Sequence, residues 1–153
     1  MAVSNVSRGA KRRLQPAGEK ARVLLADDNP AVLQHVSALL ADDFDVVATV
    51  PDGEGVQSKY IELKPDLLIL DISMRKVSGL EAARSLRRQG FNPCLIFLSV
   101  HEEQDFVQAA MACGASGYVV KSHLISDLIP AIKASVAGNL FISPCLTYTP
   151  PAE

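Results

Sequence analysis

Short runs of aliphatic residues alternate along the chain with stretches whose apolar residues recur every three or four positions. The runs cover residues 22–26, 46–50, 67–70, 94–98 and 116–120. The periodic stretches cover residues 30–40, 53–63, 79–89, 101–113 and 124–137. Apolar runs of this length are typical of strands buried on both faces, and the periodic stretches are typical of helices with one apolar face. Five such units in succession predict a doubly wound α/β domain with a five-stranded parallel sheet.

Capping residues and prolines indicate where these elements begin and end. Asn29 followed by Pro30 predicts a helix start, because an asparagine side chain caps well and proline lacks only an N–H that would be unpaired there. Pro130 fits the last helix if Asp127 is its N-cap, since the proline then falls in the first turn. Residues 139–153 have no periodic pattern and are expected to form a docked segment or the start of a linker.

Composition and charge narrow the class of protein. The 153 residues, 48% of them hydrophobic, are sufficient for one globular core without disulfides or metals. No apolar run approaches the roughly 20 residues that span a bilayer, and no secretory signal is recognised, so we expect a cytoplasmic protein that does not engage membranes. The three cysteines, Cys94, Cys113 and Cys145, are expected to be reduced and buried.

The charge is unevenly distributed. Residues 1–20 contain five Lys and Arg residues and one Glu, whereas the remainder has ten basic and sixteen acidic residues. The first segment is therefore predicted to be a flexible basic tail. The acidic remainder argues against direct nucleic-acid binding, and four clustered charges without aromatic residues give the tail only a weak signature for it.

Polar residues with a shared chemistry follow four of the five predicted strands. They are Asp27 and Asp28 after the first, Asp71 after the third, Ser99 after the fourth and Lys121 after the fifth. In an open parallel sheet these strand ends meet at one edge, where ligands bind. Clustered carboxylates repel one another unless a cation neutralises them, and oxygen ligands suit Mg²⁺. The pattern predicts a magnesium site that handles a phosphoryl group, with Lys121 and Ser99 contacting its oxygens.

Asp71 is the best candidate for a nucleophile that accepts the phosphoryl group. It follows residues 67–70, the shortest and most apolar run, which is predicted to be the central strand. Asp27 and Asp28 are adjacent and form a natural metal-binding pair. A carboxylate can accept a phosphoryl group as an aspartyl-phosphate, with the surrounding positive charges stabilising the transfer.

Four motifs resemble the receiver domain of bacterial two-component response regulators. They are LLADDNP at residues 24–30, PDLLILDISM at 65–74, LSVH at 98–101 and GASGYVVKS at 114–122. The resemblance covers about residues 21–140 and is specific, because four motifs occur in the family's order. It implies a flavodoxin-like fold with strand order 2-1-3-4-5. It also implies a receiver domain at residues 21–140, between the tail at 1–20 and a linker start at 141–153.

The same resemblance implies a role for each site residue. Asp71 would be the phosphoacceptor, and Ser99 and Lys121 would contact the phosphoryl group. Mg²⁺ would be held by Asp27, Asp28, Asp71 and the backbone carbonyl of Ser73. Tyr118 would be the switch aromatic, whose ring moves inward when Ser99 is drawn towards the phosphate.

Residues 98–101, 114–118 and 138–144 are similar to receivers that precede a LuxR-type or NarL-type helix-turn-helix domain. This similarity implies a sensor histidine kinase as phosphodonor, dimerisation on phosphorylation, and control of transcription through DNA contacts made by an output domain. No helix-turn-helix pattern is present in these 153 residues, so we expect either a piece of a longer regulator or a stand-alone receiver. Arg75 stands where the family commonly has proline, which adds charge near the site and puts the rates of phosphorylation and dephosphorylation in question.

The sequence favours a switch that catalyses only its own phosphoryl transfer and dephosphorylation over three other functions. A phosphohydrolase of the haloacid-dehalogenase type would need a second carboxylate at Ser73. A phosphate-independent binding or dimerisation module is disfavoured by the complete set of site residues. A nucleotide-binding fold lacks its glycine-rich loop. The three histidines, His35, His101 and His123, are too dispersed for a metal site. His101 is near the predicted site edge, where a contact with the site is one alternative, but a solvated loop position is expected for it.

Overall fold

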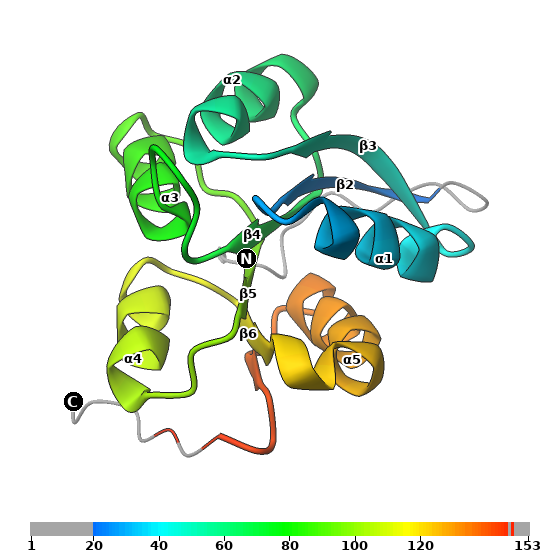
Figure 1. Ribbon diagram of the computed structural model, residues 1–153. Coiled ribbons are helices and arrows are strands. Elements are labelled where there is room, and N and C mark those ends of the chain that lie inside the picture. Colours follow the sequence, from blue (N-terminus) through cyan, green and yellow to red (C-terminus); the bar gives the residue numbers. More distant parts are fainter. Residues whose placement is uncertain (1–19, 147, 149–153) are drawn as a thin grey trace, which may run out of the picture.

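The computed structural model describes residues 20–146 and residue 148, which form one parallel sheet between two layers of helices (Figure 1). The strands are β2 (Ala21–Ala26), β3 (Phe44–Val50), β4 (Leu67–Asp71), β5 (Leu95–Ser99), β6 (Gly117–Val120) and β7 (Phe141–Ile142). The helices are α1 (Pro30–Leu40), α2 (Gly53–Leu63), α3 (Gly79–Arg88), α4 (Gln104–Ala112) and α5 (Leu124–Val136). A 3₁₀ turn, η2 (Lys121–His123), precedes α5. The predicted flexible tail lies, except for Lys20, outside the described residues.

The strand order is β3-β2-β4-β5-β6-β7, so the predicted order 2-1-3-4-5 is confirmed for the first five strands. All neighbouring strands are parallel. The prediction of five strands was incomplete, because Phe141 and Ile142 pair with Gly117 and Tyr118 as a sixth. A two-residue strand is too short to show a period, and only its position beside β6 reveals it.

The two faces of the sheet bury two separate hydrophobic clusters. Alternate strand residues such as Leu24, Leu68 and Phe97 pack with α2, α3 and α4 on one face. Their neighbours, such as Leu25 and Ile69, pack with α1 and α5 on the other face. In Figure 1 the two groups of helices lie on opposite sides of the sheet. Every residue of β4 and β5 is buried, which confirms the third predicted strand as a central one.

Helix α4 begins later than the sequence predicted, and one capping prediction for α5 was wrong. Helix α4 begins at Gln104 rather than His101, because the backbone N–H of His101 donates to Ser99 Oγ (2.9 Å) and its carbonyl accepts from the Tyr118 hydroxyl (2.7 Å). Helix α5 begins at Leu124, where the apolar period predicted it, but the N-cap suggested at Asp127 was wrong, because Pro130 lies inside the helix.

The start of α5 at Leu124 has a reason in the packing of the helix. Leu124 and Leu128 are buried in the cluster shared by α1 and α5, and this burial favours the extra turn. The cost is that Pro130 has no N–H to donate to the carbonyl of Ser126.

Among the cysteines, Cys94 and Cys113 are buried as expected, whereas Cys145 is exposed, contrary to expectation. All three are free.

The start of α1 matches the sequence prediction and gives a first test. Asn29 Oδ1 accepts a hydrogen bond from the Ala31 N–H (2.9 Å), and Pro30 is the first helical residue. Asn29→Ala is expected to lower the free energy of unfolding by about 1 kcal/mol, because the cap is lost. Urea denaturation would measure this change. Asn29→Ser, which keeps a capping oxygen, should retain most of the stability, and equal losses in both variants would contradict the capping role.

Candidate functional site

The carboxyl end of β4 places Asp71 at the centre of the site. Asp71 is 5% exposed, and its Oδ1 accepts a hydrogen bond from the Ser73 backbone N–H (3.2 Å). Helix α3 begins close to this strand end, with the Gly79 N–H donating to the Ile72 carbonyl (2.8 Å). A Cβ atom on Gly79 would lie 2.0 Å from the Asp71 carbonyl oxygen, so only glycine permits this approach. The packing of α3 therefore fixes the backbone that carries the carboxylate.

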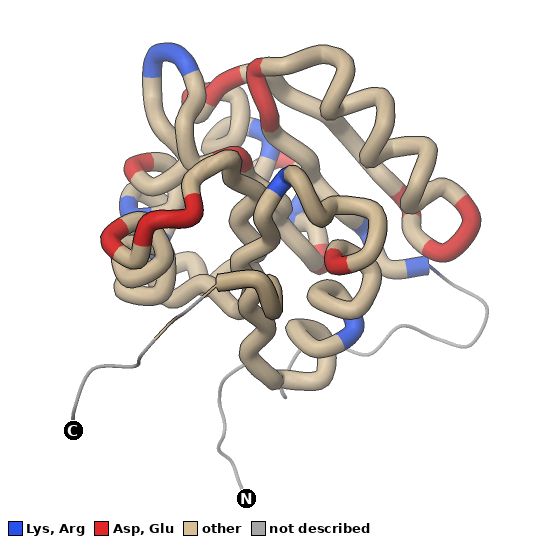
Figure 2. The backbone as a smooth tube through the Cα atoms, turned by 60° about the horizontal axis from the view of Figure 1, so that its bottom comes forward, with Lys and Arg blue, Asp and Glu red and all other residues tan. Residues whose placement is uncertain are grey.

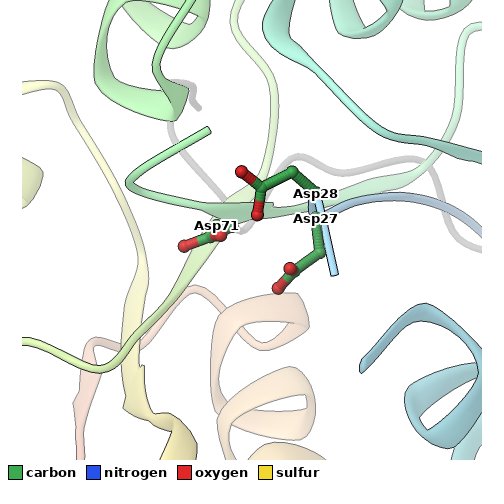
Figure 3. A group of neighbouring side chains, drawn as sticks. All are labelled: Asp27, Asp28 and Asp71. Atoms are coloured by element: carbon green, nitrogen blue, oxygen red, sulfur yellow. The ribbon is translucent and has the colours of Figure 1, made fainter. Parts of the chain in front are cut away.

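Asp27 and Asp28 follow β2, next to β4 in the sheet. Asp27 is fully buried, and its Oδ1 accepts from the Asn29 N–H (2.9 Å). The Asp28 side chain is 28% exposed and lies at the rim, where its Oδ2 is 3.9 Å from Arg75 Nε. Figure 3 shows the side chains of Asp27, Asp28 and Asp71 grouped at these strand ends. One carboxylate oxygen from each lies within 4.8 Å of the others, so the structure brings the predicted acidic residues together.

Lys121 supplies the positive charge inside this group. Its Nζ is 2.7 Å from Asp27 Oδ2 and 3.3 Å from Asp71 Oδ2, and its side chain is only 17% exposed. The ammonium group thus links the two buried carboxylates. Lys121 follows β6 directly, two strands away from β4, which is why only the folded sheet brings it to Asp71.

The pKa of Asp71 is raised from its ordinary value of 3.8 to about 6. Burial is the largest cause, because it disfavours the charged form, and the neighbouring charge of Asp27 adds to it. Lys121 and the hydrogen bond from Ser73 act in the opposite direction without cancelling these effects. The site therefore holds more negative charge than one lysine neutralises.

The donor set fits a small divalent cation with hard character. All three converging side chains offer carboxylate oxygens, which Mg²⁺ prefers, and Asp28 is open to solvent so that bound water can be kept. The described part of the chain has 15 acidic and 11 basic residues. Figure 2 shows where these residues lie along the backbone. Both the local excess of carboxylates and the overall charge favour the approach of a cation.

Ser99, Tyr118 and His101 form a second group beside the carboxylates. Ser99 and Tyr118 are fully buried, and both bond to the backbone of His101, Ser99 Oγ as acceptor and the Tyr118 hydroxyl as donor. Burial raises the pKa of the Tyr118 hydroxyl above its ordinary value of 10.0, which strengthens its preference for the protonated, hydrogen-bond-donating form. The structure thus joins the predicted switch residues through one loop, residues 100–103.

His101 has more contacts than a solvated loop position would give it. Its Nε2 lies 3.2 Å from Ser73 Oγ, so the side chain bridges from the β5–α4 loop to the β4–α3 loop. Its ring stacks on Phe106, with centroids 3.9 Å apart. The expectation of a solvated loop position for His101 was therefore wrong, and the sequence signal for the alternative, a contact with the site, was its position two residues after Ser99 at a strand end.

The loop that carries Arg75 and Lys76 is joined to α2 by a backbone hydrogen bond from the Gly53 N–H to the Val77 carbonyl (3.1 Å) and by exposed ion pairs, without a proline. Lys76 has a positive φ of 65°, a conformation unusual for a residue with a side chain. Its Nζ lies 3.7 Å from Asp52 Oδ2 and 3.9 Å from Glu54 Oε1 at the start of α2. Asp52 also caps α2, through a bond from the Gly55 N–H. The ion pairs therefore tie the loop to α2 beside the site.

Comparisons with known proteins agree with this geometry. Residues 23–133 match the model of the family described as "Response regulator receiver domain". The chain is 33% identical over 131 residues to the transcriptional regulatory protein DegU of Brevibacillus brevis, covering 84% of this chain and 56% of DegU. It is 34% identical over 131 residues to the nitrate/nitrite response regulator protein NarL of Escherichia coli K12, covering 84% of this chain and 61% of NarL.

A solved structure shows the same arrangement of helices and strands. It is a two-component response regulator of the LuxR family from Aurantimonas sp. SI85-9A1, with a TM-score of 0.79 and 32% identity over 84% of this chain and 93% of that one. The chain spans little more than half the length of the curated relatives it matches.

No helix in the described ranges, residues 20–146 and 148, is long and apolar enough to cross a membrane.

Proposed function

The chain belongs to the response regulator receiver domain family, of the NarL/LuxR type, and we propose that Asp71 is its phosphoacceptor and Mg²⁺ its cofactor. One observation carries this proposal. Lys121 Nζ lies between Asp27 and Asp71, 2.7 Å from the first carboxylate and 3.3 Å from the second, in a largely buried site. A cation in this position can neutralise the charge that a phosphoryl group would bring to Asp71.

The chemistry is the transfer of a phosphoryl group to a carboxylate. An Asp71 carboxylate oxygen forms a bond to phosphorus while the bond from phosphorus to the donor's leaving group breaks. With a phosphohistidine donor, the leaving group is an imidazole nitrogen; with acetyl phosphate, it is acetate. Lys121 and Ser99 are proposed to contact the phosphoryl oxygens. Asp27, Asp28, Asp71 and the Ser73 carbonyl are proposed to hold Mg²⁺, which supplies further charge neutralisation when bound.

The switch is proposed to act through the residues that join Ser99 to Tyr118. Ser99 Oγ accepts from the His101 N–H, and the Tyr118 hydroxyl donates to the His101 carbonyl. If Ser99 turns towards a phosphoryl group, it gives up the bond to His101, and the carbonyl that holds Tyr118 is then free to move. Phosphorylation would shift the population between two arrangements of this loop.

Membership of the receiver family also indicates which proteins this chain is proposed to interact with. Response regulators receive phosphate from histidine kinases, and we propose a sensor histidine kinase as the donor here. We further propose dimerisation on phosphorylation and control of transcription through an output domain outside these 153 residues, with no direct nucleic-acid contact by this chain. The receiver is proposed to span residues 21–140, between a tail at 1–20 and a linker start at 141–153.

Intact-protein mass after incubation with acetyl phosphate tests the proposal. The chain is expected to gain the mass of one phosphoryl group in Mg²⁺ and none when a chelator removes the metal, because the charge of the transferred group is then unbalanced. The adduct should be absent from Asp71→Asn. A folded chain that shows no adduct in Mg²⁺, or an adduct that persists in Asp71→Asn, would contradict the proposed function.

A further inference from the structure

The segment after α5 is hydrogen-bonded to β6 along the edge of that strand that does not pair with β5. We call residues 141–146 the C-terminal strap. The Phe141 N–H donates to the Ser116 carbonyl and the Ser143 N–H to the Tyr118 carbonyl, both at 2.9 Å. Ser143 Oγ then accepts from the Val120 N–H (3.0 Å), so a side chain continues the ladder where β7 ends. Ser143 is fully buried, which makes this hydroxyl a structural partner of β6 rather than a surface group.

The strand that pairs with the strap carries one residue of the site, Tyr118, and directly precedes another, Lys121. Tyr118 accepts from the strap with its carbonyl and donates to the His101 carbonyl with its hydroxyl. Val120, which donates to Ser143, directly precedes Lys121, and Lys121 pairs with Asp27 and Asp71. Only one peptide unit therefore separates the Ser143 hydrogen bond from the lysine that neutralises the carboxylates.

Side-chain packing provides a second connection. Ile142 and Leu146 of the strap pack against the hydrophobic cluster that contains Tyr118 and Val120. In Figure 1 the segment after α5, in red, reaches β6 and continues towards the side of the molecule occupied by α4. Because the core is close-packed, a shift of the Tyr118 ring changes the surface on which the strap rests.

We propose that the C-terminal strap is a latch, which when seated on β6 stabilises the unphosphorylated site and is released by phosphorylation of Asp71. This inference rests on the proposed function. In the seated arrangement Lys121 pairs with Asp71 Oδ2 itself, whereas a phosphoryl group on Asp71 would draw the ammonium outwards to its own oxygens. The Val120 peptide would move with Lys121 and lengthen its bond to Ser143, which is held in the core. Release would free the chain that follows the strap.

Hydrogen exchange followed by mass spectrometry tests the latch in the wild-type chain. Samples with and without acetyl phosphate are compared in Mg²⁺, and an aliquot of each is weighed intact to measure the phosphoryl adduct. In the phosphorylated sample, exchange at the amides of Val120 and the strap is expected to rise about tenfold or more, because their hydrogen bonds open. Exchange in β2 and β3 should stay the same.

The two proposals fail in distinguishable ways. An adduct accompanied by unchanged or slower exchange in the strap would overturn the latch and leave the proposed function standing. A missing adduct would overturn the proposed function, and the latch with it, since no phosphoryl group would then drive release.

The Ser143→Ala variant tests the reverse direction of the coupling. If the seated latch holds the site in its unreactive arrangement, weakening it raises the population of the released arrangement, so the adduct should form about threefold to tenfold faster, the effect of losing one hydrogen bond. Ser58→Ala, which removes an exposed hydroxyl on α2, is the matched control and should not change the rate. A folded Ser143→Ala chain that reacts at the control rate would overturn the proposal. If this variant does not fold, the exchange experiment on the wild type decides.

Discussion

Replacing Asp71 with asparagine is expected to make the metal-free chain more stable by about 2 to 3 kcal/mol while abolishing phosphorylation. The reason is the raised pKa of Asp71, about 6 in the folded chain against an ordinary 3.8. The folded state disfavours the charged carboxylate because it is buried and lies close to Asp27. Asparagine keeps the shape and removes the charge. The substitution thus removes the nucleophile and also removes a destabilising charge.

The pH dependence of this gain follows from the sign of the shift. A carboxylate whose folded pKa is raised contributes stability fully below its unfolded pKa, and that contribution is lost as the pH rises through the folded pKa. The wild type should therefore approach Asp71→Asn in stability below about pH 4 and fall behind it between about pH 4 and 6. Above this window the difference should be constant.

Urea denaturation in a chelating buffer at several pH values would measure the effect. Asp42→Asn, a change at an exposed carboxylate in the turn after α1, serves as the control and should alter the free energy of unfolding by less than about 0.5 kcal/mol. Added Mg²⁺ is expected to narrow the gap, because it stabilises the wild type through Asp71. Equal stabilities of wild type and Asp71→Asn at pH 8 without metal would contradict the electrostatic account.

Lys121→Met is expected to destabilise the metal-free chain by about 3 kcal/mol or more. Methionine retains an unbranched apolar side chain and removes the ammonium group that pairs with Asp27 and Asp71. Two carboxylates, of 0% and 7% side-chain exposure, then face each other without a counter-charge. Breaking a buried ion pair by removing one partner is costly because the other charge remains buried.

A double-variant cycle separates charge from packing in this prediction. Lys121→Met combined with Asp71→Asn should recover part of the loss, because one of the two repelling charges is gone. Lys133→Met, at an exposed position on α5, should leave the free energy of unfolding nearly unchanged. If Lys121→Met behaves like Lys133→Met in urea denaturation, Lys121 does not neutralise the site as the geometry indicates.

The sequence alone determined the architecture and most of the candidate site. Alternating apolar runs and helical periods predicted the parallel sheet, since both patterns arise from local spacing. The position of Asp27, Asp71 and Lys121 just after predicted strands was enough to place them at one edge of the sheet, because parallel topology gathers carboxyl ends there. The cap at Asn29 was equally readable, since it depends on two neighbouring residues.

The tertiary structure decided the features that depend on contacts between distant segments. Burial of Leu124 and Leu128 in the core placed Pro130 inside α5, and the bonds of His101 to Ser99 and Tyr118 delayed the start of α4. The strap became visible only through the bonds of Ser143 to β6, because two strand residues carry no period. The pairing of Lys121 and the raised pKa of Asp71 likewise required the fold, since both depend on burial and on distances between strands.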